Sequence, residues 1–415
     1  MRFRPFYVAS ALLAACAFGA GPAAGQLKLG QYEDEAPFRT WNTHPFTAAS
    51  ALGRGGTSFT LATDPSAALA NPALLPLLPR FSVLVNGALQ TATFNKYGFV
   101  NTGIFITQGN LDQNQTGLDF AGLSIRIGYW AVALSVSEAE SYARPQALYE
   151  EPGPNGRTAY LLQWIQTGSL RVLNFGIGRM LGGGLSLGLG VNYAFGSLRR
   201  EYAEQIYGAG GYRISDAVTQ DFRGVYLNGG LLWAPTSKFR AAAVFRTPYP
   251  KKVQGRSTLA YTAPDGPTDI TITATSDDEA RQPLVLGLGV SWDLLPRLVL
   301  AAEASFHNWS AYALNEFGED RDRAFRDVVR VGLGLEFKQQ ITLFGGRFDI
   351  PSRVGVIYDP QPAKNPASSY WDFTIGTGLA AKHVRLDFGA LIGREWGSGA
   401  ALAVRKFSIS FGFQL

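Results

Sequence analysis

The segment RLVLAAEASFH, residues 297–307, alternates between two kinds of side chain along its whole length. One set of alternate positions carries Leu298, Leu300, Ala302, Ala304 and Phe306, and the other includes Glu303, Ser305 and His307. A period of two residues is typical of a β-strand, whose side chains point to opposite faces in turn. At about ten residues, the strand is longer than most strands of soluble sheets.

The same pattern recurs from residue 81 to the C-terminus, for instance in RVGLGLEFK (residues 330–338) and HVRLDFGALIG (residues 383–393). We count fourteen such segments, at 81–94, 117–128, 130–141, 168–180, 184–201, 218–235, 238–256, 280–294, 297–310, 326–340, 351–360, 369–381, 383–397 and 401–415. Long strands in even number, each with one apolar face, are typical of a transmembrane barrel whose apolar side chains face lipid. The sequence therefore predicts an all-β antiparallel barrel over residues 81–415.

The connections between these segments alternate between short and long. Short turns of such barrels lie on the periplasmic side and long loops lie outside the cell. The connection 341–350 is longer than we expect of a periplasmic turn. Many glycines lie on the polar faces of the strands, among them Gly188, Gly190, Gly287, Gly289, Gly332 and Gly334.

Composition excludes several classes of protein. Charged residues make up only 17% of the 415 residues, and no dense run of Lys or Arg indicates a nucleic-acid surface. Cys16 is the only cysteine, so neither an intrachain disulfide nor a cysteine-ligated metal is possible. Glu303, Ser305 and His307 share one strand face, but a nucleophile, base and acid in one line make a poor catalytic triad. We expect no enzyme activity, no metal and no cofactor.

The first residues, MRFRPFYVASALLAACAFGAGPAAGQ, combine two arginines with an apolar run, which predicts a secretory signal over residues 1–25. Small residues before Gln26 suit cleavage at that point. The sequence around Cys16 also fits a lipoprotein signal, which would leave that cysteine lipidated at the new N-terminus. Both interpretations export the protein.

The segment between the signal and the first strand, residues 26–80, is predicted to plug the barrel. Its part TLATDPSAALANPALLPLLPRF, residues 60–81, is interrupted by prolines yet rich in leucines that require burial. A fourteen-stranded barrel is too wide to be filled by its own lining side chains. Glycines would let the plug turn tightly against the wall, and Asp64 and Asn71 would cap its local turns.

Three motifs in order resemble the FadL-type outer-membrane transporters of long-chain fatty acids and other hydrophobic molecules. They are ALGRGGTSFTLATDPSAALANPALLPLL (51–78), VFRTPYPKKVQG (244–255) and RVGVIYDPQPAKNPASSYWDFTIGTGL (353–379). The resemblance assigns a plug motif to Gly53, Gly55, Gly56, Asp64, Asn71, Pro72 and Ala73. It implies an outer-membrane channel of a Gram-negative-type bacterium that takes up hydrophobic molecules such as long-chain fatty acids passively, past a plug that shifts.

The sequence offers two further sets of candidate residues. An apolar connection is a candidate for ligand capture, through Leu148, Tyr149, Arg157, Tyr160, Leu162 and Trp164. The alternatives are that this connection extends the strands above the membrane and that Arg157 is only solvated. Strand parity places a set of charges inside the barrel, namely Glu303, Arg330, Glu336, Lys338, Arg353, Arg385 and Asp387. We expect these charges to pair with one another or with the plug, a substrate contact being the alternative.

The expected partners are a hydrophobic small-molecule ligand and outer-membrane lipid, with no nucleic acid and with the protein as a monomer. A second interpretation remains open, in which the barrel transports nothing and presents or shuttles a protein partner, like the shuttle barrels of type IX secretion.

Overall fold

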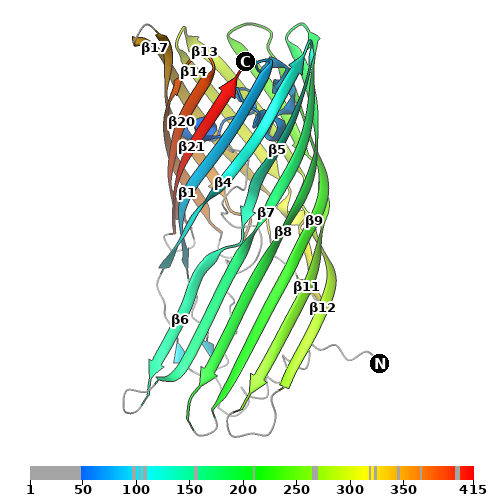
Figure 1. Cartoon of the computed structure of the whole chain (residues 1–415), viewed down its shortest axis with the longest axis vertical. Coiled ribbons are helices and arrows are strands. Elements are labelled where there is room, and N and C mark those ends of the chain that lie inside the picture. The colour runs from blue at the N-terminus through cyan, green and yellow to red at the C-terminus, as the bar shows by residue number, and fades with distance from the viewer. Residues whose placement is uncertain are drawn as a thin grey trace.

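A computed structural model shows a closed antiparallel barrel of fourteen wall strands (Figure 1). The structure describes residues 48–415 except 96–99, 102–103, 106–109, 154–157, 209–210, 264–269, 317–318, 322–324, 344–345, 365–366 and 398–401. The predicted signal peptide, Cys16 and the first part of the predicted plug therefore lie outside the described residues.

The wall strands follow one another around the barrel in chain order. They are β1 (Phe81–Asn95), β4 (Asn110–Ile127), β5 (Trp130–Ser141), β7 (Thr158–Gly182), β8 (Leu185–Ile206), β9 (Tyr212–Trp233), β10 (Phe239–Arg246), β13 (Val285–Leu295), β14 (Leu298–His307), β17 (Val328–Leu343), β18 (Gly346–Pro360), β19 (Ser369–Ala380), β20 (Val384–Trp396) and β21 (Ala403–Gln414). The last strand pairs with the first, from Ser82 opposite Gln414 to Ala92 opposite Val404, and this pairing closes the barrel. The predicted fold class and strand count are confirmed.

One expected boundary is wrong. Residues 341–350 are not a long connection, because β17 and β18 continue as a paired hairpin until Leu343 lies opposite Gly346. The segment is rich in apolar residues, among them Ile341, Leu343, Phe348 and Ile350, and it extends the two strands.

The two ends of the barrel differ. Short turns such as Gly182–Gly184, whose three glycines have positive φ angles, lie at the end near the C-terminus (Figure 1). At the other end, the long-loop end, one side of the wall continues as a tall sheet. Added strands build this extension: β6 (Arg144–Pro152), β11 (Tyr249–Thr262) and β12 (Ile270–Gln282) beside β7, β8 and β9. Four shorter strands complete the described chain: β2 (Val100–Asn101), β3 (Ile104–Phe105), β15 (Ala313–Glu316) and β16 (Glu319–Arg321).

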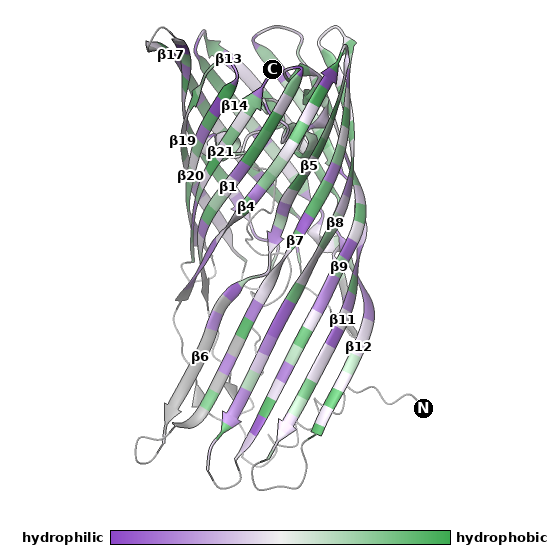
Figure 2. Ribbon diagram, viewed as in Figure 1, coloured by the Kyte–Doolittle hydropathy of each residue, from purple (hydrophilic) through white to green (hydrophobic). Residues whose placement is uncertain are grey.

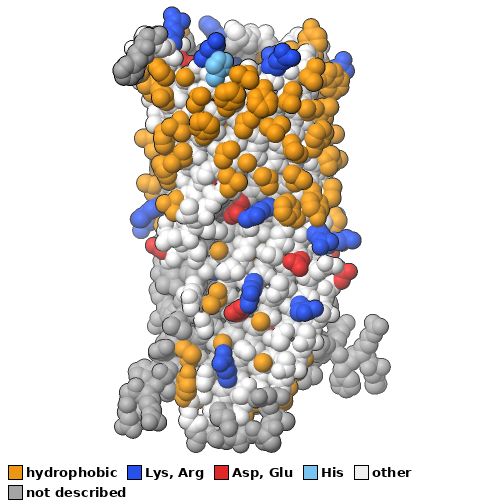
Figure 3. Space-filling view, in the orientation of Figure 1, with side chains coloured by type: hydrophobic (Ala, Val, Ile, Leu, Met, Phe, Trp, Pro, Cys, Tyr) orange, Lys and Arg blue, Asp and Glu red, His pale blue; other side chains and the backbone are white. Residues whose placement is uncertain are grey.

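On the face shown in Figures 2 and 3, apolar side chains cover the short-turn half of the barrel, whereas the tall sheet is mostly polar. Trp130, Trp233 and Trp292 are about half exposed close to the short turns, as membrane-interface tryptophans are. Trp309, in a 3₁₀ turn (η3, Trp309–Ala311), instead packs on Tyr312 and Phe325. None of the helices in the described part of the chain has the length and apolarity that crossing a membrane requires.

The segment before β1 lies inside the barrel, in its short-turn half (Figure 1). It contains two short helices, α2 (Ala49–Gly53) and α3 (Ala67–Ala70), and a 3₁₀ helix, η1 (Pro72–Leu77). Helix α2 contacts β18, β19, β20 and β21, whereas η1 contacts β5, β7, β8 and β9 on the other side of the wall. We call residues 48–80 the plug.

Candidate functional site

The glycines of the plug turn lie against wall glycines. Gly55 and Gly56 have φ angles of 62° and 70°, which favour glycine, and they reverse the chain after α2. A Cβ atom on Gly55 would stand 2.1 Å from the carbonyl oxygen of Leu333, and one on Gly53 would stand 2.6 Å from the Cα atom of Gly376. The plug backbone thus packs directly on the wall backbone. This contact explains why the polar strand faces carry so many glycines.

Asn71 connects three parts of the plug and wall. Its Oδ1 accepts a hydrogen bond from the amide of Ala73 and thereby caps η1 at Pro72. Its Nδ2 donates to the carbonyl of Phe59 at 2.8 Å. Earlier in the plug, Asp64 accepts from the amide of Ser66 at 3.0 Å. Asp64 and Asn71 therefore each fix a local turn of the plug.

Three buried asparagines form a ladder from the wall to the plug, and sequence reasoning missed them. Asn174 of β7 donates to Asn192 of β8 at 2.8 Å, and Asn192 donates to Asn228 of β9 at 2.7 Å. Asn228 in turn donates to the carbonyl of Ala68 in α3 at 2.9 Å. The ladder holds the plug by side-chain amides, which carry no charge and tolerate an apolar surrounding when they are paired.

A chain of charges holds the other side of the plug. We call Arg54, Glu336, Arg353, Asp387 and Arg385 the plug anchor. Arg54 of the plug pairs with Glu336 at 2.5 Å, and Arg353 joins Glu336 at 2.7 Å to Asp387 at 2.8 Å. Arg385 pairs with Asp387 and donates to the hydroxyl of Thr63 in the plug. These charges thus pair with one another and with the plug, and Arg54 was not among the residues singled out in the sequence.

The other three expected lumen charges differ in their partners and in their position along the barrel. Glu303 is buried and accepts the plug amides of Ser58 and Phe59 at 2.6 and 2.5 Å. Arg330 lies 3.7 Å from Asp359, in the long-loop half of the wall. Lys338 has a side chain 55% exposed and lies 3.7 Å from Glu336, near the short-turn end. Strand parity therefore places a side chain on a face but does not give its depth.

An aromatic layer fills the lumen beyond the plug, toward the long-loop end. It consists of Tyr142, Phe222, Tyr226, Tyr249, Tyr312 and Phe325, all buried and joined by apolar side chains in one cluster. Tyr226 stacks on Tyr249 at 4.7 Å between ring centroids, and Tyr142 meets Phe222 edge to face at 5.2 Å. Leu69 of the plug packs against this layer. The interior of a membrane barrel is usually polar, so this buried aromatic layer is the unusual feature of the lumen.

Lys251 lies within the layer. The Nζ atom of Lys251 is 4.4 Å from the centroid of the Phe222 ring and 5.5 Å from that of Tyr142. It also donates to the Tyr142 hydroxyl at 3.3 Å. The rings hold the charge by cation–π attraction, which is strongest where water is excluded.

The predicted capture connection forms a hairpin rather than a free loop. Strands β6 and β7 pair from Arg144 opposite Gln166 as far as Pro152 opposite Thr158, and Tyr149 lies opposite Leu162. The backbones of Leu148, Tyr160 and Trp164 belong to the same hairpin. Arg157 lies outside the described residues. The backbone of this segment therefore has the form of the alternative given above, in which the strands continue above the membrane.

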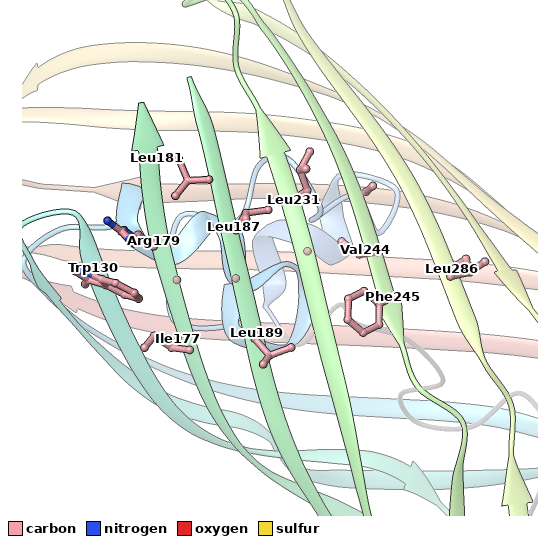
Figure 4. Close-up of a pocket in the computed structure, with 14 residues that line it drawn as sticks. Trp130, Ile177, Arg179, Leu181, Leu187, Leu189, Leu231, Val244, Phe245 and Leu286 are labelled. Atoms are coloured by element: carbon pink, nitrogen blue, oxygen red, sulfur yellow. The ribbon is translucent and has the colours of Figure 1, made fainter. Parts of the chain in front are cut away.

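An apolar groove of about 720 Å³ opens on the outer face of β7, β8, β9 and β10 (Figure 4). Its lining includes Leu187, Leu189, Leu231 and Phe245. The plug lies directly behind it, since a Cβ atom on Gly188 would stand 2.2 Å from the carbonyl carbon of Pro72. Only glycine backbone separates the plug from the groove at this point.

The wall hydrogen bonding is interrupted beside the groove. Strand β9 pairs with β11 as far as Arg223 and with β10 from Asn228 onward. Between these points the Thr247 amide donates to the Leu227 carbonyl, and the Leu227 amide bonds the Thr247 side-chain oxygen. Pro248 follows and offers no amide donor. On the neighbouring strand, the gap between β12 and β13 holds Pro283 at the same height.

The fold and this lumen define an outer-membrane β-barrel with an internal plug. The family model described as BamG matches residues 80–398, and the chain belongs to the BamG family, a family of outer-membrane barrels. It is an outer-membrane protein of a Gram-negative-type bacterium. No curated protein matches the chain significantly.

Solved structures share the fold at low sequence identity. The toluene transporter TbuX of Ralstonia pickettii is 16% identical, covers 88% of this chain and 98% of its own, and gives a TM-score of 0.60. A FadL homologue of Pseudomonas aeruginosa is 16% identical over 91% and 99%, with a TM-score of 0.63. The P. putida toluene transporter TodX is 14% identical over 88% and 97%, with a TM-score of 0.62. The FadL-type fold predicted from the three motifs is thereby confirmed.

Proposed function

We propose that this barrel admits small hydrophobic molecules through the outer membrane, with the aromatic layer as their binding place above the plug. The buried aromatic layer carries this proposal, because a lumen that passed polar solutes would not be lined by packed rings. Long-chain fatty acids and monoaromatic hydrocarbons both suit such a layer. A carboxylate would have Lys251 and Arg246 as nearby cations, whereas a hydrocarbon would need only the rings.

The exit we propose is lateral, into the membrane. Tyr226 and Tyr249 of the aromatic layer lie at the height of the interruption around Thr247 and Pro248. The apolar groove begins on the outer face beside it, at Phe245. A molecule that leaves the lumen here meets the lipid-facing apolar side chains of the groove.

The hydrogen-bond partners of Glu303 favour transport over catalysis. Ser305 and His307 contact each other at 3.1 Å, but the Glu303 carboxylate accepts hydrogen bonds from two plug amides. A triad acid orients the histidine, and here the acid orients the plug instead.

We expect replacement of Phe222 by Ala to weaken binding of a monoaromatic hydrocarbon about tenfold or more, because a stacked ring contributes about 1 kcal/mol or more beyond its buried area. Binding is measured on the purified barrel by equilibrium dialysis with radiolabelled toluene. Phe175→Ala is the matched control, since Phe175 is half exposed on the lipid-facing side of β7. Equal affinities for the two variants would place the ligand elsewhere.

A second function has one observation in its favour. Within the described residues, β12 pairs with β15 only at Ala280 and Arg281, so its remaining length leaves one edge of the tall sheet open. Open strand edges are common docking places for an added strand of another protein. Purification from gently solubilised native membranes distinguishes the two functions. A stoichiometric protein partner that is lost when Thr273 is replaced by Pro would favour a partner-presenting barrel.

A further inference from the structure

Two cations lie opposite each other on the outer face of the tall sheet. Arg223 of β9 is the direct cross-strand partner of Lys252 of β11, and both side chains are exposed. In the same row, Arg171 of β7 and Arg223 both lie opposite Phe195 of β8. Three basic residues thus share one row across four strands. Like charges directly opposite each other destabilise a sheet.

Neither member of the pair finds a counter-ion within the described part of the protein. Among the residues that the structure describes, none forms a hydrogen bond or ion pair with Arg223 or Lys252, although Glu279 is the cross-strand partner of Lys252 on β12. By contrast, Arg199 and Glu201 of the same sheet form an ion pair, with 2.5 Å between their charged atoms. The row is therefore open to an anion from outside the protein.

The height of the row identifies the source of that anion. Two residues closer to the short-turn end, the adjacent outward row consists of Leu173, Tyr193 and Val225, which are 43%, 41% and 58% exposed. These side chains are apolar or aromatic and exposed, so they face lipid. The cations lie at the boundary of this lipid-facing surface on the long-loop side, which is the outer leaflet of the membrane. Anions fixed at that level are the phosphate groups of lipid headgroups.

We propose that Arg223 and Lys252 bind a phosphate group of an outer-leaflet lipid. Neighbouring strands are about 4.8 Å apart, so both side chains can reach one phosphate. Arg171, two strands from Arg223, lies opposite the acidic Glu138 of β5 and is not part of the proposed site. The acyl chains lie along Leu173, Tyr193 and Val225. This site is independent of the lumen and of the proposed uptake.

The test measures how much lipid A the full barrel retains, by native mass spectrometry after reconstitution with diphosphorylated lipid A. Arg223→Gln/Lys252→Gln is compared with Arg213→Gln/Arg256→Gln, which removes two exposed cations from the same strands farther from the apolar surface. We expect the first variant to lose about tenfold or more in affinity, since one charge-assisted hydrogen bond is worth about 1.5–3 kcal/mol. The second variant should stay within about twofold of the wild type, because its cations lie beyond the headgroup level.

Two further arms complete the test. Lipid A without phosphates should bind the wild type as weakly as it binds the Arg223→Gln/Lys252→Gln variant. Equal losses in both variants, or full retention of the dephosphorylated lipid, would overturn the proposal. Inorganic phosphate that binds the detergent-solubilised barrel as well as the lipid does would show a free-phosphate site and would overturn it too. Heat-modifiable migration on gels shows that each variant is a folded barrel.

Discussion

Deletion of residues 26–80 is expected to convert the barrel into an open pore that conducts ions. The wall can close without the plug, because the ladder from β1 to β21 is complete within residues 81–415. The lumen of fourteen strands is too wide for its lining side chains to seal. In planar bilayers the deletion variant should therefore show steady conductance, whereas the intact protein should show little.

A milder variant tests whether the plug seals the lumen while the barrel wall still folds. Gly188→Val introduces a side chain where the plug backbone stands 2.2 Å from a Cβ atom, so it should displace η1 while the wall still pairs. Conductance between that of the intact protein and that of the deletion variant is the expected result. A deletion variant that conducts no more than the intact protein would contradict the inference that this segment seals the lumen.

Replacement of Arg353 by Met is expected to lower the free energy of unfolding by about 3 kcal/mol. The Arg353 side chain is only 1% exposed and bridges Glu336 and Asp387, so its loss leaves two buried carboxylates short of a partner. The expected value lies at the lower end of the usual range because Arg54 and Arg385 still pair with these carboxylates. Urea titration in detergent, followed by tryptophan fluorescence, measures the change.

Arg199→Met is the matched control for this variant. Arg199 pairs with Glu201 at 2.5 Å, but the arginine side chain is 68% exposed, so its loss should change the free energy of unfolding by about 0–1 kcal/mol. Similar values for the two arginines would show that the plug anchor adds no stability.

Strand parity predicted much of the wall and of the plug anchor. The alternation in RVGLGLEFK places Glu336 inside, and the structure pairs it with Arg54 of the plug. Parity depends only on the period of the strand, which a single segment reveals. The turn-forming character of Asp64 and Asn71 was equally local, since each side chain caps a turn within two residues.

The features that sequence reasoning missed depend on register between distant strands. Asn174, Asn192 and Asn228 form a ladder only because β7, β8 and β9 pair in one particular register. Tyr142 and Phe222 likewise meet although β7 and β8 separate them in the wall. Nothing in the neighbourhood of each residue indicates its partner. The strand extension at 341–350 was missed for another reason, because Gly345 and Gly346 interrupt its alternation as the glycines of a loop do.

The rate at which a small hydrophobic molecule enters cells tests the central claim most directly. Radiolabelled toluene is supplied to cells that lack the protein and to cells that carry it, with equal amounts of folded barrel checked by heat-modifiable migration. The account predicts faster entry in cells with the wild-type barrel and entry near the background rate with Phe222→Ala. Entry at the background rate with the wild-type barrel, for toluene and for a long-chain fatty acid alike, would contradict it.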